Sequence, residues 1–473
     1  MKKLKIALIS LGGLVLLLAA IVVAITLIFD PNEYKPQLQA AASEALGMQV
    51  QVNGKLGVRF YPGLRLALND VEVRDQDKEL VAIKEIRVGL ELMPLLQQQY
   101  RIKSVSLITP TVSIESGATA SNKQDVKAEI PAIELSKISI SDGNFSYVDK
   151  ATGDKFAAKG CDITMRNLQL GTEAVDIVKK LSFTSDLHCR TVNFKQFTVS
   201  NAKFSAIAND GVFDLKPITL DIFGGEGSGG VRADYSGSTP RYNVQFSLPH
   251  FSVDQLLKAM SSEVILAGPM SFSANLSLQG SSAQQIERSA AGDVVLHGNG
   301  LKLQGYDLDK VFSRFESSQS FNLLDMGALL VAGPAGIAIT KGKDFAGLLT
   351  GAEGETGIST IVARWKVKRG VMHSSDVAMA TAKHRMALLG ALDIAGGRFV
   401  DVVVALLDSK GCAQVQQKIN GPFKNPVVEQ PSSVKAVAAP VLNVFKKGKE
   451  LLAGDDCKVI YSGKVVVPAA VAK

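Results

Sequence analysis

The sequence has few charged residues and few histidines. Asp, Glu, Lys and Arg make up 21% of 473 residues, and there are five histidines and four cysteines. No two histidines form an H-x-x-x-H pair and no two cysteines form a C-x-x-C pair, so the common spacings of zinc ligands are missing. No Ser-His-Asp order or paired-carboxylate motif stands out. We therefore expect no metal, no cofactor and no catalytic residues, and hence a protein that is not an enzyme.

A basic stripe of the kind that binds nucleic acid is also missing. The net charge is +7, but lysines cluster at residues 2–5 and 446–449, and the middle of the chain is nearly balanced. No run of basic residues is interleaved with aromatic ones, so we expect no nucleic-acid partner. The lysines at 446–449 fit two readings: a solvated helix end, or a contact with anionic lipid headgroups or an acidic partner.

Two glycine-rich stretches resemble nucleotide-binding motifs but depart from them. Gly225–Gly230 matches G-x-G-x-x-G, yet Val231, Ala233 and Tyr235 continue in strand alternation where a dinucleotide site needs a helix. The pattern predicts a glycine-rich turn or bulge there. Residues 336–343 have the wrong spacing for a phosphate-binding loop, and Asp344 stands where Ser or Thr is required.

One long apolar segment is present near the N-terminus. Ile6 to Phe29 contains no charged residue, with lysines before it and Asp30 and Glu33 after it. At about 1.5 Å per residue it is long enough to cross a bilayer, and the lysines place the N-terminus in the cytoplasm. A cleaved signal peptide is the alternative, but its apolar region is usually about 7–15 residues long and ends at a small-x-small site. We expect an uncleaved anchor.

A short helix and then many strands are predicted after the anchor. Asp30 and Glu33 fit a helix start and Gly47 fits its end, which predicts a helix over residues 30–47. From Met48 onward apolar and polar residues alternate, as in strands with one apolar face. The alternating stretches are residues 48–73, 86–92, 102–114, 133–147, 192–213, 218–223, 242–248, 272–278 and 294–303.

The strictest alternation selects candidate residues for an apolar groove. They are Leu64, Leu66, Leu68, Ile86, Val88, Leu90 and Leu92. Side chains spaced by two residues share one face of a strand, so these residues face an apolar interior, which is either a sandwich core or an open groove. If the groove is open, they are the expected contacts for lipid acyl chains.

Several other segments have distinct patterns. The polar stretch 116–129 predicts a loop, and the stretch 400–407, which is apolar except for Asp401, predicts a fully buried strand. Helical spacing predicts short helices at 172–180 and 253–260 and an amphipathic helix at 433–452. The predicted fold class is therefore mainly β: an N-terminal transmembrane helix followed by an elongated, curved, groove-like antiparallel sheet with a few short helices.

Both ends of the chain resemble the AsmA family of Gram-negative envelope proteins. The matching stretches are Phe29–Pro36, Leu46–Gly47, Tyr61–Leu64, Gly305–Asp309, Ala332–Gly336, Gly411–Ile419, Gly421–Phe423, Cys457 and Tyr461–Gly463. The resemblance implies an anchor at 1–29, a membrane-proximal helix at 30–47, a repetitive β-groove at 48–304 and an AsmA-like C-terminal region at 305–473.

The resemblance also implies a place in the cell and a role. It implies a single-pass protein of the inner membrane with its bulk in the periplasm, linked to outer-membrane biogenesis and to phospholipid movement between membranes. The expected partners are the inner membrane, phospholipid acyl chains and an outer-membrane or envelope protein. The alternative is a non-conducting envelope scaffold that influences outer-membrane protein assembly or targeting. The two differ in whether the chain itself seals the apolar face.

Disulfides are expected because an exported chain meets an oxidising compartment. Four cysteines allow three connectivities, and spacing alone does not choose among them. Cys412 and Cys457 flank the predicted amphipathic helix, and the AsmA family carries cysteines in both contexts, so we predict a Cys412–Cys457 bond, with two free buried thiols as the alternative. Pairing of Cys161 with Cys189 stays open at this point.

Overall fold

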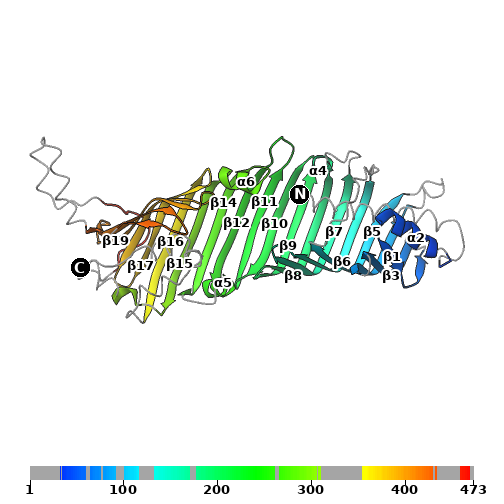
Figure 1. The fold of residues 1–473 in the computed structure, drawn as a ribbon, viewed down its shortest axis with the longest axis horizontal. Coiled ribbons are helices and arrows are strands. Elements are labelled where there is room, and N and C mark those ends of the chain that lie inside the picture. The colour runs from blue at the N-terminus through cyan, green and yellow to red at the C-terminus, as the bar shows by residue number, and fades with distance from the viewer. Residues whose placement is uncertain are drawn as a thin grey trace, which may run out of the picture. The chain divides into compact units, whose positions relative to one another are not determined.

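A computed structural model describes most of the chain between Asn32 and Pro468 (Figure 1). The described residues are 32–33, 35–59, 64–75, 78–91, 101–116, 133–170, 177–260, 266–305, 307–310, 354–429, 432–433 and 459–468. The chain divides into two compact units, the first comprising Met1–Asp221 with Arg232–Ser238 and the second comprising Ile222–Val231 with Thr239–Lys473. Both are built mainly of β-strands, with few helices, as the sequence predicts.

Among its described residues, the first unit contains helices α2 and α4 and strands β1 to β10, although the last residue of β10 belongs to the second unit. Its helices are α2 (Lys35–Leu46) and α4 (Ile177–Lys180). Its strands are β1 (Gln49–Val52), β2 (Leu56–Arg59), β3 (Arg65–Asp75), β4 (Lys78–Leu90), β5 (Ile102–Ser116), β6 (Ile133–Asp149), β7 (Lys155–Leu170), β8 (Ser182–Phe194), β9 (Phe197–Asn209) and β10 (Val212–Ile222). Strand β11 (Gly225–Asp234) contributes residues to both units.

The described part of the second unit also consists mainly of strands, with short helices. Its helices are α5 (Val253–Met260) and α6 (Ala283–Ser289). Its strands are β12 (Arg241–Ser252), β13 (Leu266–Ala267), β14 (Pro269–Gln279), β15 (Ala291–Gln304), β16 (Glu355–Lys368), β17 (Val371–Thr381), β18 (Arg385–Asp393), β19 (Arg398–Leu407), β20 (Ala413–Pro422), β21 (Val427–Val428) and β22 (Ser432–Ser433).

The helix predicted before the strands is α2, and it covers the first strands of the first unit. It ends at Gly47, whose φ of 62° is the left-handed conformation that commonly ends helices. Leu38 and Ala42 are buried in one hydrophobic cluster with side chains of β1 to β5. The backbone N–H of Val50 donates to Ser43 Oγ at 2.9 Å, and Lys35 Nζ donates to the carbonyl of Gly54 at 3.0 Å. These contacts hold α2 on the sheet.

The strands of the first unit follow one another with one change of direction. From β3 to β5 and from β6 to β10 each strand pairs with the next in antiparallel register. In contrast, β5 and β6 are parallel, with Val105 opposite Ile138 and Ile114 opposite Tyr147. The prediction of an antiparallel sheet is therefore wrong at this pair. A parallel pair needs a connection of a dozen or more residues, and residues 117–132 between the two strands are enough for one.

The central parts of strands β16 to β19 in the second unit are buried on both faces. One face contributes Trp365, Met379 and Val404 to a large core, and the other contributes Ala378 and Ala405 to a second cluster with Tyr461. The Tyr461 hydroxyl donates to Asp376 Oδ1 at 2.7 Å, and Arg385 donates to carbonyl oxygens of Val465 and Asp408. Burial of the phenol raises the pKa of Tyr461. The strand predicted at 400–407 is confirmed as part of β19, but it is fully buried only over residues 404–407, because Asp401 is exposed and Val403 is half-buried.

Other predictions have mixed outcomes. The helix predicted at 253–260 is confirmed as α5, and α4 forms the end of the one predicted at 172–180. The glycine run 225–230 lies within β11, after a turn at Phe223–Gly224, so a turn within the run itself is wrong, while a bulge there stays a prediction. A side chain on Gly229 would meet the backbone of Gln245 and Phe246, so close packing of β11 explains this glycine.

Some predicted segments fall outside the described residues. They are the anchor at 6–29, the loop at 117–129 and nearly all of the helix predicted at 433–452, while Ser433 at its start belongs to β22. Among the residues that the structure describes, no helix has the length and hydropathy needed to span a bilayer. Single-pass anchoring stays a prediction. The division of the chain into segments 1–29, 30–47, 48–304 and 305–473 also stays a prediction.

Candidate functional site

The groove residues predicted from the sequence lie in a closed core. Leu64, Leu66, Leu68, Ile86, Val88 and Leu90 are between 0% and 7% exposed, in the cluster that α2 covers. Their alternation correctly places them on one face of β3 and β4, because Leu66 lies opposite Val88 and Leu68 opposite Ile86. Leu92 lies outside the described residues. Acyl contacts of these residues stay a prediction, and would require α2 to move away.

Figure 1 shows the neighbouring strands of the same unit, β5 to β10. These strands carry an apolar face whose side chains are only partly buried. Side chains opposite each other in register lie on the same side of a sheet, so registers that continue from strand to strand define rows across the sheet. We call the resulting surface the apolar face and number its rows from the end of β6 toward its start.

Five rows make up the apolar face. Row 1 is Ile114, Tyr147, Phe156, Phe194 and Phe197; row 2 is Val112, Phe145, Ala158, Val192 and Val199; row 3 is Gly143, Cys161, Cys189 and Ala202; row 4 is Leu107, Ile140, Ile163, Leu187, Phe204 and Ile218; row 5 is Val105, Ile138, Met165, Ser185, Ala206 and Leu215. Nearly all of these side chains are apolar.

Much of this surface reaches solvent. In row 1, Ile114 is 43% exposed, Phe156 37% and Phe194 51%. On β6 to β9 the larger side chains of rows 2 and 4 are half-buried, including Phe145, Ile163 and Phe204, whereas Leu107 of row 4 is buried in the core that α2 covers. Contiguous exposed apolar surface is uncommon on soluble proteins and marks a binding surface. The apolar face is therefore our candidate functional site.

Strands β5 to β9 each change their alternation at the same level, between rows 2 and 4. In β8, for example, Leu187 and Cys189 precede the change and Val192 and Phe194 follow it. Residues with positive φ mark this level, at Asp142 in β6, Gly160 in β7 and Asn201 in β9. Because Phe145, Leu187 and Val192 all pack around the buried cysteines, both halves of the strands present their apolar residues to one side.

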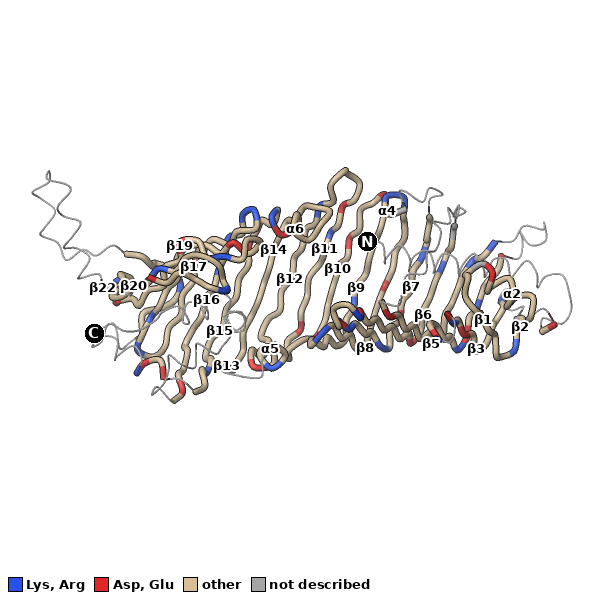
Figure 2. Tube along the Cα trace, in the orientation of Figure 1, with Lys and Arg blue, Asp and Glu red and all other residues tan. Residues whose placement is uncertain are grey.

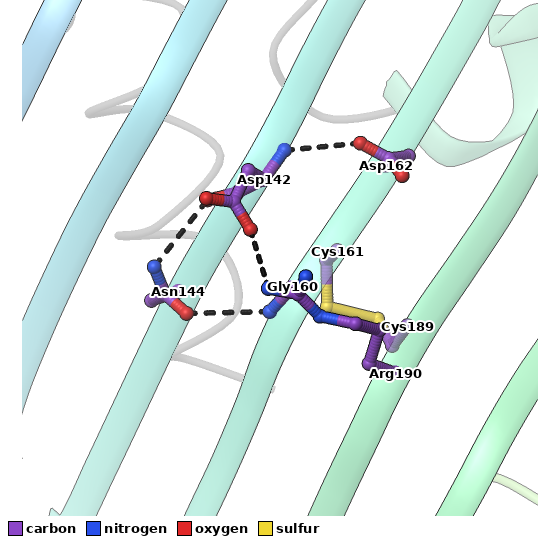
Figure 3. The surroundings of a disulfide bond; sticks show 7 residues. All are labelled: Asp142, Asn144, Gly160, Cys161, Asp162, Cys189 and Arg190. Atoms are coloured by element: carbon purple, nitrogen blue, oxygen red, sulfur yellow. Dashed lines mark hydrogen bonds and ion pairs between the residues drawn. A yellow bond between two sulfur atoms is a disulfide. The ribbon is translucent and has the colours of Figure 1, made fainter.

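A network of polar contacts stabilises this level of the sheet (Figure 3). Arg190 donates to Asp142 Oδ1 at 2.6 Å, and the backbone N–H of Asp142 donates to Asp162 Oδ1 at 3.0 Å. The backbone N–H of Gly160 donates to the Asn144 side chain at 3.2 Å. A side chain on Gly160 would have to displace the Arg190 side chain, and the φ of 60° at this position favours glycine.

A disulfide lies in row 3. Cys161 of β7 and Cys189 of β8 are directly opposite each other, with Cα atoms 4.0 Å apart, and they are bonded (Figure 3). This settles the pairing that the sequence left open and excludes cross-pairing of either cysteine with Cys412. Cys412 forms a backbone bridge with Val459, but Cys457 lies outside the described residues. The predicted Cys412–Cys457 bond stays a prediction.

The opposite face of these strands is polar, with charges of both signs. Arg166 Nη1 lies 2.8 Å from Asp186 Oδ2, and Arg232 pairs with Asp214. Figure 2 shows acidic and basic residues interspersed along the strands instead of a patch of one sign. Hydrogen bonds from Arg166 and then from Ser205 lower the pKa of Asp186. Side chains of β7 to β10 line a pocket of about 420 Å³, but its carboxylates already have protein partners.

The sequence contains a signal for the apolar face that alternation alone does not reveal. Apolar residues recur every second position, skip one extra position, and then recur every second position again, as at Leu187, Cys189, Val192 and Phe194. The same skip in neighbouring strands would have predicted a shared bend with one continuous apolar side.

A comparison with protein families matches the AsmA family model to residues 1–179 and 122–377. These two matches together include more than half of the sequence. The chain belongs to the AsmA family. A search of curated proteins finds no match. Membership in the AsmA family supports an envelope-associated function of a lipid-transport-like kind.

Proposed function

We propose that this AsmA protein binds phospholipid acyl chains on the apolar face of β5 to β10 and carries phospholipid between the membranes of the envelope, in support of outer-membrane biogenesis. The observation that supports the proposal is the continuity of the five rows from strand to strand. The inner-membrane anchor, the periplasmic position of the two units and an outer-membrane or envelope partner belong to the same proposal.

The rows suit acyl chains for a simple energetic reason. Each methylene that leaves water for an apolar surface gains about 0.8 kcal/mol, so a chain that lies over several rows is held without any specific polar contact. The backbone amides beneath are paired within the sheet. An open apolar face therefore leaves no unpaired backbone groups on its floor, and lipid can move along it without breaking hydrogen bonds. The proposal assigns no catalytic step to the chain.

The alternative is a non-conducting scaffold, and one observation favours it. Strands β1 to β5 contribute to the core that α2 covers, and the central parts of β16 to β19 are buried on both faces, so parts of the apolar surface are sealed by the chain itself. Lipid carriage is the better-supported function because rows 1, 2 and 4 keep large side chains partly exposed.

A charge placed in row 4 tests the proposal. In a Phe204→Asp variant of the full chain, a carboxylate stands among Ile163, Leu187 and Ile218, where an acyl chain would have to desolvate it. We expect the lipid that co-purifies with the chain, measured by mass spectrometry, to fall at least about tenfold, equivalent to about 1.4 kcal/mol.

The matched control is Lys203→Asp, which changes the adjacent position on the polar face of β9. Lys203 is exposed and lies opposite His188. This variant should keep its lipid. Equal lipid content in folded Phe204→Asp and wild-type protein would favour the scaffold.

A further inference from the structure

Row 1 differs from the other rows in being mainly aromatic. It contains Tyr147, Phe156, Phe194 and Phe197 on four successive strands, each in register with the next. It also lies at the rim of the apolar face, next to the turns that connect β6 to β7 and β8 to β9. Aromatic side chains are enriched where apolar surface meets water and headgroups, because their rings suit such a boundary.

Lys195 places a positive charge over this aromatic rim. It follows Phe194 in the turn before β9, and its φ of 54° is the left-handed conformation. Its ammonium nitrogen lies 5.6 Å from the centroid of the Phe194 ring and 3.1 Å from Asp154 Oδ2. The backbone N–H of Lys195 donates to the carbonyl of Lys155, which fixes the turn. The charge is thus held beside the face that the apolar rows form.

The ion pair with Asp154 leaves this charge available to a second anion. The side chains of Lys195 and Asp154 are 44% and 40% exposed, and ion pairs at such exposed positions are weak. An ammonium group has three N–H donors, and one carboxylate oxygen does not use all of them. A phosphate group at the rim would meet a cation already positioned by the Phe194 ring.

We infer that the apolar face has a polarity: the phosphate of a two-chain phospholipid sits at the aromatic rim on Lys195, and its acyl chains extend from row 1 over rows 2 to 5. The inference rests on the proposed function and adds a headgroup position to it. Lys195 is thereby assigned a role in distinguishing lipids that carry a phosphate from neutral lipids with the same acyl chains. The remaining rows contribute affinity for both kinds of lipid.

The test compares two lipids and two variants. The full chain in detergent is incubated with vesicles that contain either phosphatidylglycerol or diacylglycerol with identical acyl chains, and the bound lipid is quantified by mass spectrometry after repurification. We expect Lys195→Glu to lower phosphatidylglycerol loading about fivefold, the ratio for about 1 kcal/mol, and to leave diacylglycerol loading unchanged. Lys203→Glu on the polar face of β9 is the matched control and should change neither.

Three results would overturn the inference. Equal loss of both lipids in Lys195→Glu would show that the residue acts only on the fold, and unchanged loading of both would show that phosphate does not contact it. Equal loss of phosphatidylglycerol in Lys203→Glu would show a non-specific charge effect. If wild-type protein loads neither lipid, the proposed function itself fails.

Discussion

At the scale of single residues, the disulfide in row 3 is the strongest local constraint on the apolar face. Cys161 and Cys189 are 28 positions apart in the sequence, and closing a loop of that size is worth about 3.5 kcal/mol in the chain-entropy model. We expect the double variant Cys161→Ser, Cys189→Ser to lose about that much in its free energy of unfolding, measured by urea denaturation. A loss of only about 0.5 kcal/mol, typical of a surface substitution, would show that the neighbouring strands already fix this pair.

The ion pairs of Glu115 should make part of the thermal stability depend on pH in the acid range. Hydrogen bonds from Lys150 and then from Lys78 lower its pKa from 4.5 to about 2. A carboxylate whose pKa is lower in the folded state contributes stability above its unfolded pKa, and that contribution is lost as the pH falls toward the folded value. Wild-type protein should therefore melt at a higher temperature than Glu115→Gln at neutral pH, and the difference should disappear between pH 4.5 and pH 2.

Thermal unfolding of both proteins over this pH range measures the effect. Glu79→Gln, which removes an exposed carboxylate from strand β4, is the control. A difference between wild type and Glu115→Gln that persists at the acid end would contradict the assignment of the effect to this carboxylate.

At the scale of elements, α2 decides which apolar residues are closed off. Leu38 is 3% exposed and packs in the cluster that contains Leu66 and Val88. Leu38→Ala should lower the free energy of unfolding by about 2–5 kcal/mol, the range for buried Leu→Ala changes. Gln37→Ala, at an exposed position of the same helix, should change it by no more than about 0.5 kcal/mol. Similar losses in both variants would show that Leu38 does not anchor α2.

The same helix shows what an alternating pattern can predict. The alternation at Leu64–Leu68 and Ile86–Leu90 correctly identified the strands and their shared face, because a period of two follows directly from strand geometry. It did not identify what covers that face. The predicted helix before the strands supplies the cover, but its docking depends on Leu38 and Ala42 meeting β-strand side chains from later in the chain. A periodicity within one segment carries no information about such a contact.

At the scale of the whole molecule, the mainly β class with few helices followed from the sequence. The pairing of strands that are distant in the sequence could not be predicted. The parallel pair β5–β6 depends on which strand pairs with β5 after residues 117–132, which the alternation within one strand does not indicate. The glycine run 225–230 lies in a strand against which neighbouring backbone packs closely. The sequence did not predict the apolar face for a related reason. Its rows form only when strand pairing brings the extra residue in the alternation of each of β6 to β9 to the same level of the sheet.

The parallel pair also sets the order in which the first unit can assemble. Hairpin neighbours such as β6 and β7 meet across a short turn, so each can add to the last as soon as the chain provides it. Before β6 can pair with β5, the two strands must meet across the intervening residues 117–132, and the entropic cost of bringing two chain segments together grows with the number of residues between them. This pair is a seam between two hairpin-built halves. A chain that fails at the seam would retain β1–β5 under α2 and β6–β10 with its disulfide, each with an unpaired strand edge open to another chain.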